Sequence, residues 1–271
     1  MSDSNADIEI QIRDGIQTIR FTRVDKKNAM TGAMYDAARE ALQQAEHNDD
    51  IAVHVFIGSG GVFCAGNDMN DFMRRAALKP APGAKITAPS GEFIRCLPTV
   101  TKPMIAAVDG LAVGIGVTLL LHCDLVLASP TASFRAPFVN LGIIQEAGSS
   151  VIGPHRLGYN NAFELLVLGT PWDAARGKEA GLVNWVVPAA DMETKALALA
   201  HELANKPREA LMAARRMLRG DTGAIKSAIE QETAIYTGLI ASPEAKEAFS
   251  SFLEKRKPDF AKARAAAKKS G

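Results

Sequence analysis

The chain has 271 residues, with 31 Lys and Arg against 30 Asp and Glu, a formal net charge of +1 and 47% hydrophobic residues. This apolar content and balanced charge exclude a disordered chain and argue against a dedicated nucleic-acid-binding protein. The three cysteines are an odd number with no close pair, so they predict neither disulfides nor a zinc site and favour a reducing compartment.

The first elements in chain order are two paired strands and a helix. Isoleucines alternate with polar residues over residues 8–12, Asp14-Gly15 follows, and residues 16–22 form a second apolar run, which predicts a β-hairpin. Thr31 suits the N-cap of a helix, because apolar residues then recur at helical spacing. A buried strand is expected over residues 51–57.

The middle of the chain alternates strands, glycine turns and helices. Residues 76–91 are rich in proline and glycine and predict a mobile loop or the rim of a site. A helix around Phe93 is expected to precede a strand over residues 104–108, a helix over 114–121 and a strand over 124–128. Residues 104–121 are the most apolar stretch, but an aspartate and three glycines interrupt it, so we expect core elements there rather than a membrane span.

The pattern becomes mainly helical beyond residue 160. Asn160 or Asn161 is expected to cap a helix that ends at Gly169. Asp173 is expected to cap a short helix, which is followed by a strand over residues 182–187.

The C-terminal part of the chain, from residue 191 onward, is predicted to be entirely helical. Ser242-Pro243-Glu244 is a typical helix start, with proline at the first helical position. The sequence therefore predicts an α/β core over residues 1–190 and a helical region over residues 191–271, without a clear linker between them.

Two glycine-containing turns could bind a ligand through their backbone. The segment FCAGND, residues 63–68, follows the buried strand and could hold an anion or a carbonyl oxygen on its N–H groups, or could be a tight turn and helix cap. Residues 109–118 carry three glycines. A dinucleotide fingerprint, G-x-G-x-x-G, that begins at Gly114 would need a further glycine at position 119, where the chain has leucine. Residues 109–118 predict a helix N-terminus with free N–H donors, or simply close packing of a helix on a strand.

A glutamate in a third segment could act as a base. Glu146 lies among apolar and small residues in the stretch 137–150, where burial would raise its pKa toward that of a useful general base. The alternative is a surface glutamate or one at a helix start. His155 and Arg156 could line the rim of the same pocket.

Taken in order, these motifs resemble the enoyl-CoA hydratase/isomerase (crotonase) superfamily. The segments that carry the resemblance are FCAGND, KPMIAAVDGLAVGIGVTLLLHCDLVLAS and GTPWDAARGKEAGLVNWVVP, and it extends over roughly residues 8–260. The resemblance implies an α/β fold, a spiral of ββα turns whose C-terminal helices pack in a homotrimer or a dimer of trimers. It also implies an acyl-CoA thioester as the substrate, with no metal and no cofactor beyond that coenzyme A.

The resemblance assigns roles to particular residues. The backbone N–H groups of Asn67 and Ile115 would form an oxyanion hole for the thioester oxygen. Coenzyme A or the acyl group would contact a set from both turns and the N-terminal loop, namely Lys26, Lys27, Ala29, Ala65, Gly66, Asp68 and Gly114. Phe252 and Lys255 would reach the coenzyme A of a neighbouring subunit.

The catalytic positions favour one branch of the superfamily. Its hydratases use two glutamates, and the matching positions here are Thr118 and Phe138, neither of which can act as a carboxylate. Glu146 instead matches the glutamate of the peroxisomal-type Δ3,Δ2-enoyl-CoA isomerases. Another enzyme of this fold, such as a hydratase, dehalogenase or thioester hydrolase, and a non-catalytic acyl-CoA-binding protein are the alternatives.

The ends of the chain bear on its location. The N-terminus, MSDSNADIEI, is acidic and polar, unlike a secretory or transit signal. We expect a cytoplasmic protein. The C-terminus shows no peroxisomal targeting signal, although a peroxisomal location stays open.

Overall fold

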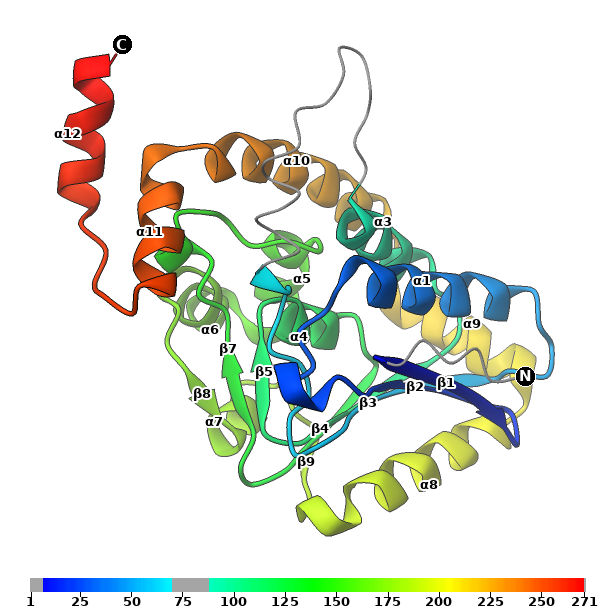
Figure 1. The fold of residues 1–271 in the computed structure, drawn as a ribbon. Helices are drawn as coiled ribbons and strands as arrows, with labels where there is room; N and C mark the ends of the chain where they lie inside the picture. Colours follow the sequence, from blue (N-terminus) through cyan, green and yellow to red (C-terminus); the bar gives the residue numbers. More distant parts are fainter. Residues whose placement is uncertain (1–6, 70–87, 271) are drawn as a thin grey trace.

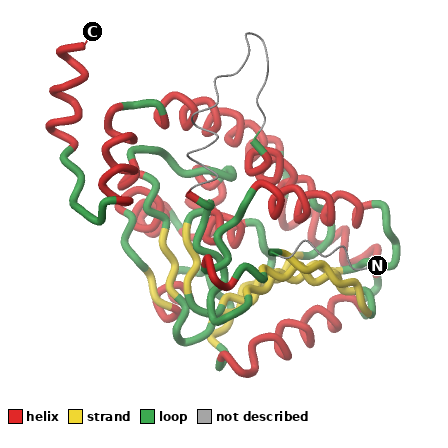
Figure 2. Tube along the Cα trace, in the orientation of Figure 1, coloured by secondary structure: helices red, strands yellow, loops and turns green. Residues whose placement is uncertain are grey.

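The computed structural model describes residues 7–69 and 88–270 of the protein. A six-stranded sheet forms the centre, with its strands in the order β1-β2-β3-β4-β6-β9, and helices surround it (Figure 2). Its strands are β1 (Ile8–Arg13), β2 (Ile16–Phe21), β3 (Val53–Gly58), β4 (Met104–Val108), β6 (Leu125–Ala128) and β9 (Trp185–Val186). All neighbouring pairs are parallel except the β1–β2 hairpin.

A second sheet lies beside the first and was not expected from the sequence. It consists of β5 (Leu111–Val113), β7 (Ser133–Arg135) and β8 (Trp172–Asp173), in the order β5-β7-β8. The chain passes from β4 of the first sheet to β5 of the second, then through a helix, and repeats this path with β6 and β7. This repetition is the predicted spiral of ββα turns, and the α/β fold class is confirmed.

The helices follow the spiral and then close the chain. Those within the spiral are α1 (Gly32–Glu46), α3 (Pro89–Cys96), α4 (Ile115–Thr118), α5 (Ser149–Leu157), α6 (Tyr159–Phe163) and α7 (Ala174–Glu179). The later ones are α8 (Met192–Ala204), α9 (Arg208–Arg219), α10 (Gly223–Ile240), α11 (Pro243–Leu253) and α12 (Phe260–Ser270). Short helical turns are η1 (Val24–Lys26), η2 (Leu97–Thr99), η3 (Leu119–Leu121), η4 (Val139–Leu141), η5 (Glu164–Leu168) and η6 (Ala189–Asp191).

Several local signals produce the elements they predict. Asp14 and Gly15 both adopt positive φ (51° and 78°), the geometry of a hairpin turn that matches strand twist. The Thr31 and Ser242 side chains accept hydrogen bonds from the N–H groups of Met34 and Ala245, so both are N-caps. The Asp173 side chain caps α7 in the same way, by accepting from the N–H of Arg176 at 2.7 Å.

The expected asparagine cap is wrong. Helix α6 follows α5 directly through Gly158, whose φ of 77° turns the chain, so no asparagine precedes the helix. The Asn161 side chain instead donates to the Leu157 carbonyl at the end of α5 and accepts from Arg176. The Asn161 side chain, which the local pattern assigns to a cap, is instead bound by Arg176 of α7.

The predicted loop over residues 76–91 is partly corrected. Its last three residues belong to α3, which begins at Pro89 because proline is tolerated in the first turn of a helix. The rest of that loop, and most of the helix expected after Asp68, lie outside the described residues.

The central sheet is covered on both faces, which explains why β4 and β6 are apolar throughout. In Figure 1, α1 lies over one face and α8 under the other. Met192, Ala196 and Ala200 of α8 pack against Val53 and Ile105 of the sheet. Within the described residues, no helix is long and apolar enough to cross a membrane, so residues 104–121 form core elements.

Helices make up all the described elements from α8 onward. They extend around the α/β core, and α12 stands off from the body of the molecule (Figure 1). The division at residue 190 and the role of this region in a trimer stay predictions.

Candidate active site

The two glycine-containing turns lie side by side. Cys64 forms a parallel bridge with Ala112: the Cys64 N–H donates to the Leu111 carbonyl (3.0 Å), and the Val113 N–H donates to the Cys64 carbonyl (2.8 Å). Asn67 and Ile115 each follow their bridged residue by three positions, so both reach the same end of this pairing.

Two glycines make this close approach possible. A Cβ atom on Gly66 would lie 3.2 Å from the Val113 carbonyl oxygen, and one on Gly116 would lie 2.8 Å from the Cys64 carbonyl oxygen. The start of α4 therefore packs directly on the first turn, with no room for larger residues.

The N–H groups of Asn67 and Ile115 are available as donors. The residues on either side of Asn67 are bonded to Met30, since the Met30 N–H donates to Gly66 and the Asp68 N–H donates to Met30. The Asn67 N–H consequently points away from Met30, because successive amides of an extended segment face opposite sides. Ile115 is the first residue of α4, whose N–H has no partner within the helix. Over residues 7–69 and 88–270, neither N–H donates to a backbone carbonyl.

Gly114 shapes the second turn. Its φ of 54° and ψ of −115° are open to glycine but not to residues with a Cβ atom. No atom lies within 4 Å of the position of a Cβ there, so this backbone borders open space. The predicted oxyanion hole thus has its two donors on neighbouring turns, at an accessible edge.

The predicted coenzyme A segment is joined to the first turn. The Ala65 N–H donates to the Lys27 carbonyl at 3.0 Å, which brings Lys26, Lys27 and Ala29 beside Gly66. Lys27 and Asn28 both have positive φ (53° and 55°), and the buried Asn28 amide is held by the carbonyls of the loop after β3. Both lysines are exposed, as phosphate-binding residues need to be.

Asp68 has a partner within the protein. The Arg23 guanidinium donates to its carboxylate at 2.7 Å and to the Ala29 carbonyl at 3.0 Å, and only 9% of Asp68 is exposed. This ion pair ties the lysine loop to the first turn. The Tyr35 hydroxyl similarly donates to the Asn67 side chain. Arg23 and Tyr35 carry no signal in the sequence that links them to a site.

Glu146 lies in the turn before α5. Its Oε1 atom is buried and has no hydrogen-bond partner among the described residues. Burial, and to a smaller extent the negative charge of Glu232 on α10, raise the pKa of the Glu146 carboxyl to about 7. The direction of this change is the one expected from the sequence, toward the range of a general base.

Glu146 acts electrostatically on the first turn. Burial raises the pKa of the Cys64 thiol to about 12, and the nearby Glu146 carboxylate contributes to that rise. The same carboxylate contributes to raising the pKa of the buried Tyr236 hydroxyl on α10. The structure therefore brings the predicted base, the FCAGND turn and the start of α4 into one neighbourhood.

The two positions that hold glutamates in hydratases are apolar in character here. Thr118 and Phe138 are both buried, and the Thr118 hydroxyl has no hydrogen-bond partner among the described residues. Neither side chain can ionise, so these two positions do not supply a carboxylate pair.

Phe252 and Lys255 do not join the site within one chain. They lie at the end of α11 and just beyond it, Phe252 is 60% exposed, and α11 is well separated from the η1 turn in Figure 1. Their contact with coenzyme A on a neighbouring subunit stays a prediction.

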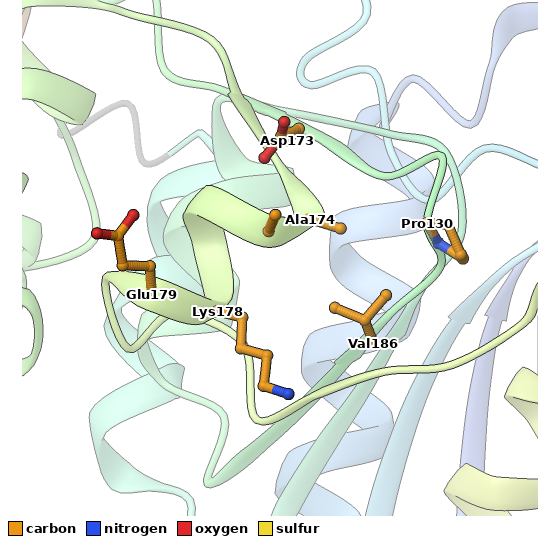
Figure 3. A pocket seen from close by; sticks show the side chains of 7 residues that line it. Pro130, Asp173, Ala174, Lys178, Glu179 and Val186 are labelled. Atoms are coloured by element: carbon orange, nitrogen blue, oxygen red, sulfur yellow. The ribbon is translucent and has the colours of Figure 1, made fainter.

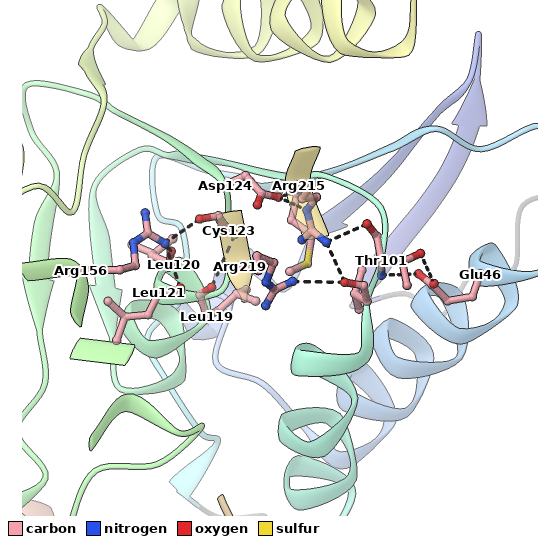
Figure 4. A network of polar contacts seen from close by, with 12 residues as sticks. Glu46, Thr101, Leu119, Leu120, Leu121, Cys123, Asp124, Arg156, Arg215 and Arg219 are labelled. Carbon is pink, nitrogen blue, oxygen red and sulfur yellow. Dashed lines mark hydrogen bonds and ion pairs between the residues drawn. The ribbon is translucent and has the colours of Figure 1, made fainter. Parts of the chain in front are cut away.

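Two hollows lined by described residues lie away from these turns. One of about 710 Å³ is formed by Pro130, the start and end of α7, and Val186 (Figure 3). Another of about 760 Å³ lies between η3, α5 and α9 and includes His155 and Arg156. Arg156 donates to the carbonyls at the end of η3 (Figure 4), so it supports the core instead of lining a rim beside Glu146. Within the described part of the chain, no cluster of His, Cys, Asp or Glu could hold a metal ion.

The chain is similar to known proteins over most of its length. The enoyl-CoA hydratase/isomerase family model matches residues 11–263. A 4-chlorobenzoyl coenzyme A dehalogenase of Arthrobacter is 31% identical over 94% of this chain and 93% of its own. Enoyl-CoA delta isomerase 2 of Rattus norvegicus is 34% identical over 90% of this chain and 62% of its own. A crystal structure of an enoyl-CoA hydratase/isomerase from Pseudoalteromonas atlantica superimposes with a TM-score of 0.86 at 30% identity, covering 93% of this chain and 99% of that one.

Proposed function

The chain belongs to the enoyl-CoA hydratase/isomerase family, and on that premise we propose that it is a Δ3,Δ2-enoyl-CoA isomerase. Its sequence and fold establish that it is an acyl-CoA enzyme of the crotonase superfamily. The isomerase activity is the finer step, and it rests on Glu146.

The proposed reaction moves one double bond and uses one base. The Glu146 carboxylate removes a proton from C2 of a 3-enoyl-CoA, and the electron pair is delocalised into a dienolate whose negative charge lies on the thioester oxygen. The N–H groups of Asn67 and Ile115 donate to that oxygen, which lowers the barrier by several kcal/mol in comparable sites. Glu146 then returns the proton to C4, giving the trans-2-enoyl-CoA.

One observation carries the proposal: Glu146 is a buried carboxyl with a pKa of about 7 beside the FCAGND turn, while Thr118 and Phe138 provide no second carboxylate. A 1,3-proton shift needs one group that can accept and return a proton near neutral pH. Addition of water needs an acceptor and a donor around the water, which a single glutamate does not supply. A dehalogenase would use a carboxylate nucleophile, and the longer glutamate side chain places its oxygens differently from an aspartate.

The remaining parts of the proposal follow from the same chemistry. The substrate brings its own coenzyme A, and the proton shift needs no metal or redox cofactor. Lys26 and Lys27 would hold its phosphates. We further propose a homotrimer or dimer of trimers, supported by the exposed apolar side chains at the end of α11, Phe252 and Leu253. We also propose that the enzyme is cytoplasmic and acts in fatty acid β-oxidation, which the substrate and the three free cysteines favour.

The direct test adds a 3-enoyl-CoA and follows the absorbance of the conjugated 2-enoyl thioester. The wild-type protein is expected to produce this absorbance, with an acid limb of kcat/KM near pH 7 because Glu146 must be ionised to accept the proton. Glu146→Gln should lower kcat by roughly 10²–10⁴-fold or more, since it removes the general base.

Two controls separate the alternatives. Glu146→Gln must still bind a CoA thioester and unfold cooperatively, so that lost turnover reports lost chemistry. A 2-enoyl-CoA given to the wild-type protein tests for hydration. Full activity of Glu146→Gln would refute the mechanism, and binding of acyl-CoA without turnover by the wild type would support the non-catalytic alternative.

A further inference from the structure

A buried carboxylate on α10 holds the turn that carries Glu146. Glu232 is 5% exposed, and each of its carboxylate oxygens accepts a backbone N–H: Oε2 from Gly148 at 2.7 Å and Oε1 from Ser150 at 2.9 Å. Both donors are orphan N–H groups at the start of α5. Glu232 therefore caps a helix from a separate element, 84 residues further along the chain than Gly148.

The turn itself has an unfavourable backbone conformation. Ala147 and Gly148 follow Glu146 with φ values of 63° and 69°, and the left-handed region is unfavourable for a residue with a Cβ such as Ala147. Such a conformation persists only where its surroundings hold it. Here the His122 Nε2 atom bonds to the Ala147 carbonyl at 2.7 Å, and the Ser149 hydroxyl donates to the Glu146 carbonyl at 2.6 Å.

Packing on α10 leaves the turn little freedom. A Cβ atom on Gly148 would lie 2.7 Å from Ile225 Cγ2 and 3.4 Å from Ile229 Cγ1. The two Glu232 bonds and these contacts fix the backbone immediately after Glu146. The direction in which the Glu146 side chain leaves the turn consequently depends on α10.

Glu232 also acts on Glu146 through its charge. Four titratable groups interact with Glu146 or with the turn that carries it. They are Glu232 and Tyr236 on α10, Cys64 in the FCAGND turn and His122 at the end of η3. Burial lowers the pKa of His122 to about 3, raises that of Cys64 to about 12 and raises that of Tyr236, so all three are uncharged at neutral pH. Burial raises the pKa of Glu232 as well, and the hydrogen bonds from Gly148 and Ser150 oppose that rise. Because both of its oxygens accept a backbone N–H, the geometry suits the carboxylate form, and its negative charge raises the pKa of Glu146.

We propose that Glu232 is the positioning residue of the base: its carboxylate anchors the turn that presents Glu146 and places a second negative charge behind it. This inference rests on the proposed function, in which Glu146 must both point at the substrate and accept a proton. The anchoring and the charge are separable, because one depends on the reach of the side chain and the other on its ionisation.

Two substitutions separate these effects. Glu232→Gln keeps the length of the side chain and one acceptor oxygen but removes the charge. Glu232→Asp keeps the charge but shortens the side chain, so that it cannot reach both N–H groups. Glu230→Gln is the matched control, since it makes the same chemical change on the same helix at an exposed carboxylate bound to Arg95.

The readout is the pH profile of isomerisation. In Glu232→Gln the acid limb of kcat/KM should move to lower pH, because a like charge no longer disfavours ionisation of Glu146. In Glu232→Asp the limb should stay near its wild-type position while kcat falls on the order of 10²-fold, because the base is misplaced. Both variants should keep the wild-type affinity for a CoA thioester, and Glu230→Gln should leave limb and rate unchanged.

A measurement without substrate keeps this inference distinct from the proposed function. The carboxyl carbon of Glu146, labelled with ¹³C and assigned by its absence in Glu146→Gln, can be titrated by NMR in each variant. A lower midpoint in Glu232→Gln supports the role of Glu232 even if the protein isomerises no 3-enoyl-CoA. An unmoved or higher midpoint in Glu232→Gln, or an unchanged kcat in Glu232→Asp, would overturn it. Glu232→Asp tests the anchoring even if Glu232→Gln fails to fold.

Discussion

At the scale of single residues, the proposed base Glu146 is a carboxyl whose ionised form is disfavoured by folding. Burial raises its pKa from 4.5 to about 7, which means that the folded protein resists the ionised form. The same ionised form is the one that accepts a proton. Catalytic competence and folding stability therefore oppose each other at this position.

This opposition predicts a stability gain in an inactive variant. Because the pKa of Glu146 is higher in the folded than in the unfolded state, its ionisation destabilises the fold increasingly as pH rises from 4.5 through about 7. Glu146→Gln should thus raise the free energy of unfolding relative to wild type by about 3 kcal/mol at pH 8 and by little at pH 4.5. Denaturant unfolding at the two pH values measures the difference.

The control for this prediction is an exposed carboxylate. Glu179→Gln, at a side chain that is 77% exposed, should change the unfolding free energy by less than about 1 kcal/mol at both pH values. If the gain in Glu146→Gln were the same at pH 4.5 and pH 8, the ionisation of Glu146 would not be its source.

At the scale of elements, the position of the proposed oxyanion donors depends on how closely α4 packs on the FCAGND turn. Gly116 is the contact point, with the Cys64 carbonyl oxygen 2.8 Å and the Cys64 Cβ 3.0 Å from where its Cβ would lie. Ile115, which provides one donor, is the residue next to it. A shift of α4 would therefore move the donor.

Gly116→Ala tests this contact. We expect it to lower the unfolding free energy by about 1–3 kcal/mol, as overpacking does, and to lower kcat/KM because the Ile115 N–H is displaced. Circular dichroism during denaturation and the isomerase assay report the two effects.

Gly238 in α10 is the matched control, because nothing lies within 4 Å of where its Cβ would be. Gly238→Ala should stabilise the protein by up to about 1 kcal/mol through helix propensity alone. Equal gains in both variants would mean that α4 has room to adjust.

At the scale of the whole molecule, one arginine joins the helical region to the α/β core (Figure 4). Arg215 of α9 is 7% exposed, donates to Asp124 at 2.8 Å and to the carbonyls of Val100 and Thr101 at 2.9 and 2.8 Å. Asp124 in turn accepts from the N–H of Met104 at the start of β4. A single side chain thus satisfies groups at the start of two neighbouring strands.

Removing this arginine should loosen the attachment of α9. Arg215→Met leaves the Asp124 carboxylate without its ion-pair partner and the Thr101 carbonyl without its side-chain donor, so we expect a loss of about 3–5 kcal/mol in unfolding free energy. Arg216→Met, at an exposed position of the same helix, should cost less than about 1 kcal/mol. Hydrogen exchange of α9 amides would show whether the loss is local, and similar losses in the two variants would contradict the assignment.

The amino-acid sequence by itself determined the features that arise within a few residues of each other. The Asp14-Gly15 hairpin and the caps at Thr31, Asp173 and Ser242 were predicted correctly because each turn or cap bonds to the backbone within three positions. The motifs also indicated the family. The residues that they assign to a site stay a prediction, which rests on backbone N–H groups of FCAGND and of the turn at Gly114.

Only the tertiary structure decided which distant groups meet. The second sheet was missed because its strands are two or three residues long and are stabilised by their pairing rather than by a periodic pattern. Asn161, Glu232 and Arg215 have no local partner that would reveal their roles. Their polar groups are buried when separate elements dock, and burial then makes each hydrogen bond obligatory. For that reason Glu146 could be named from the sequence, whereas the carboxylate that orients it could not.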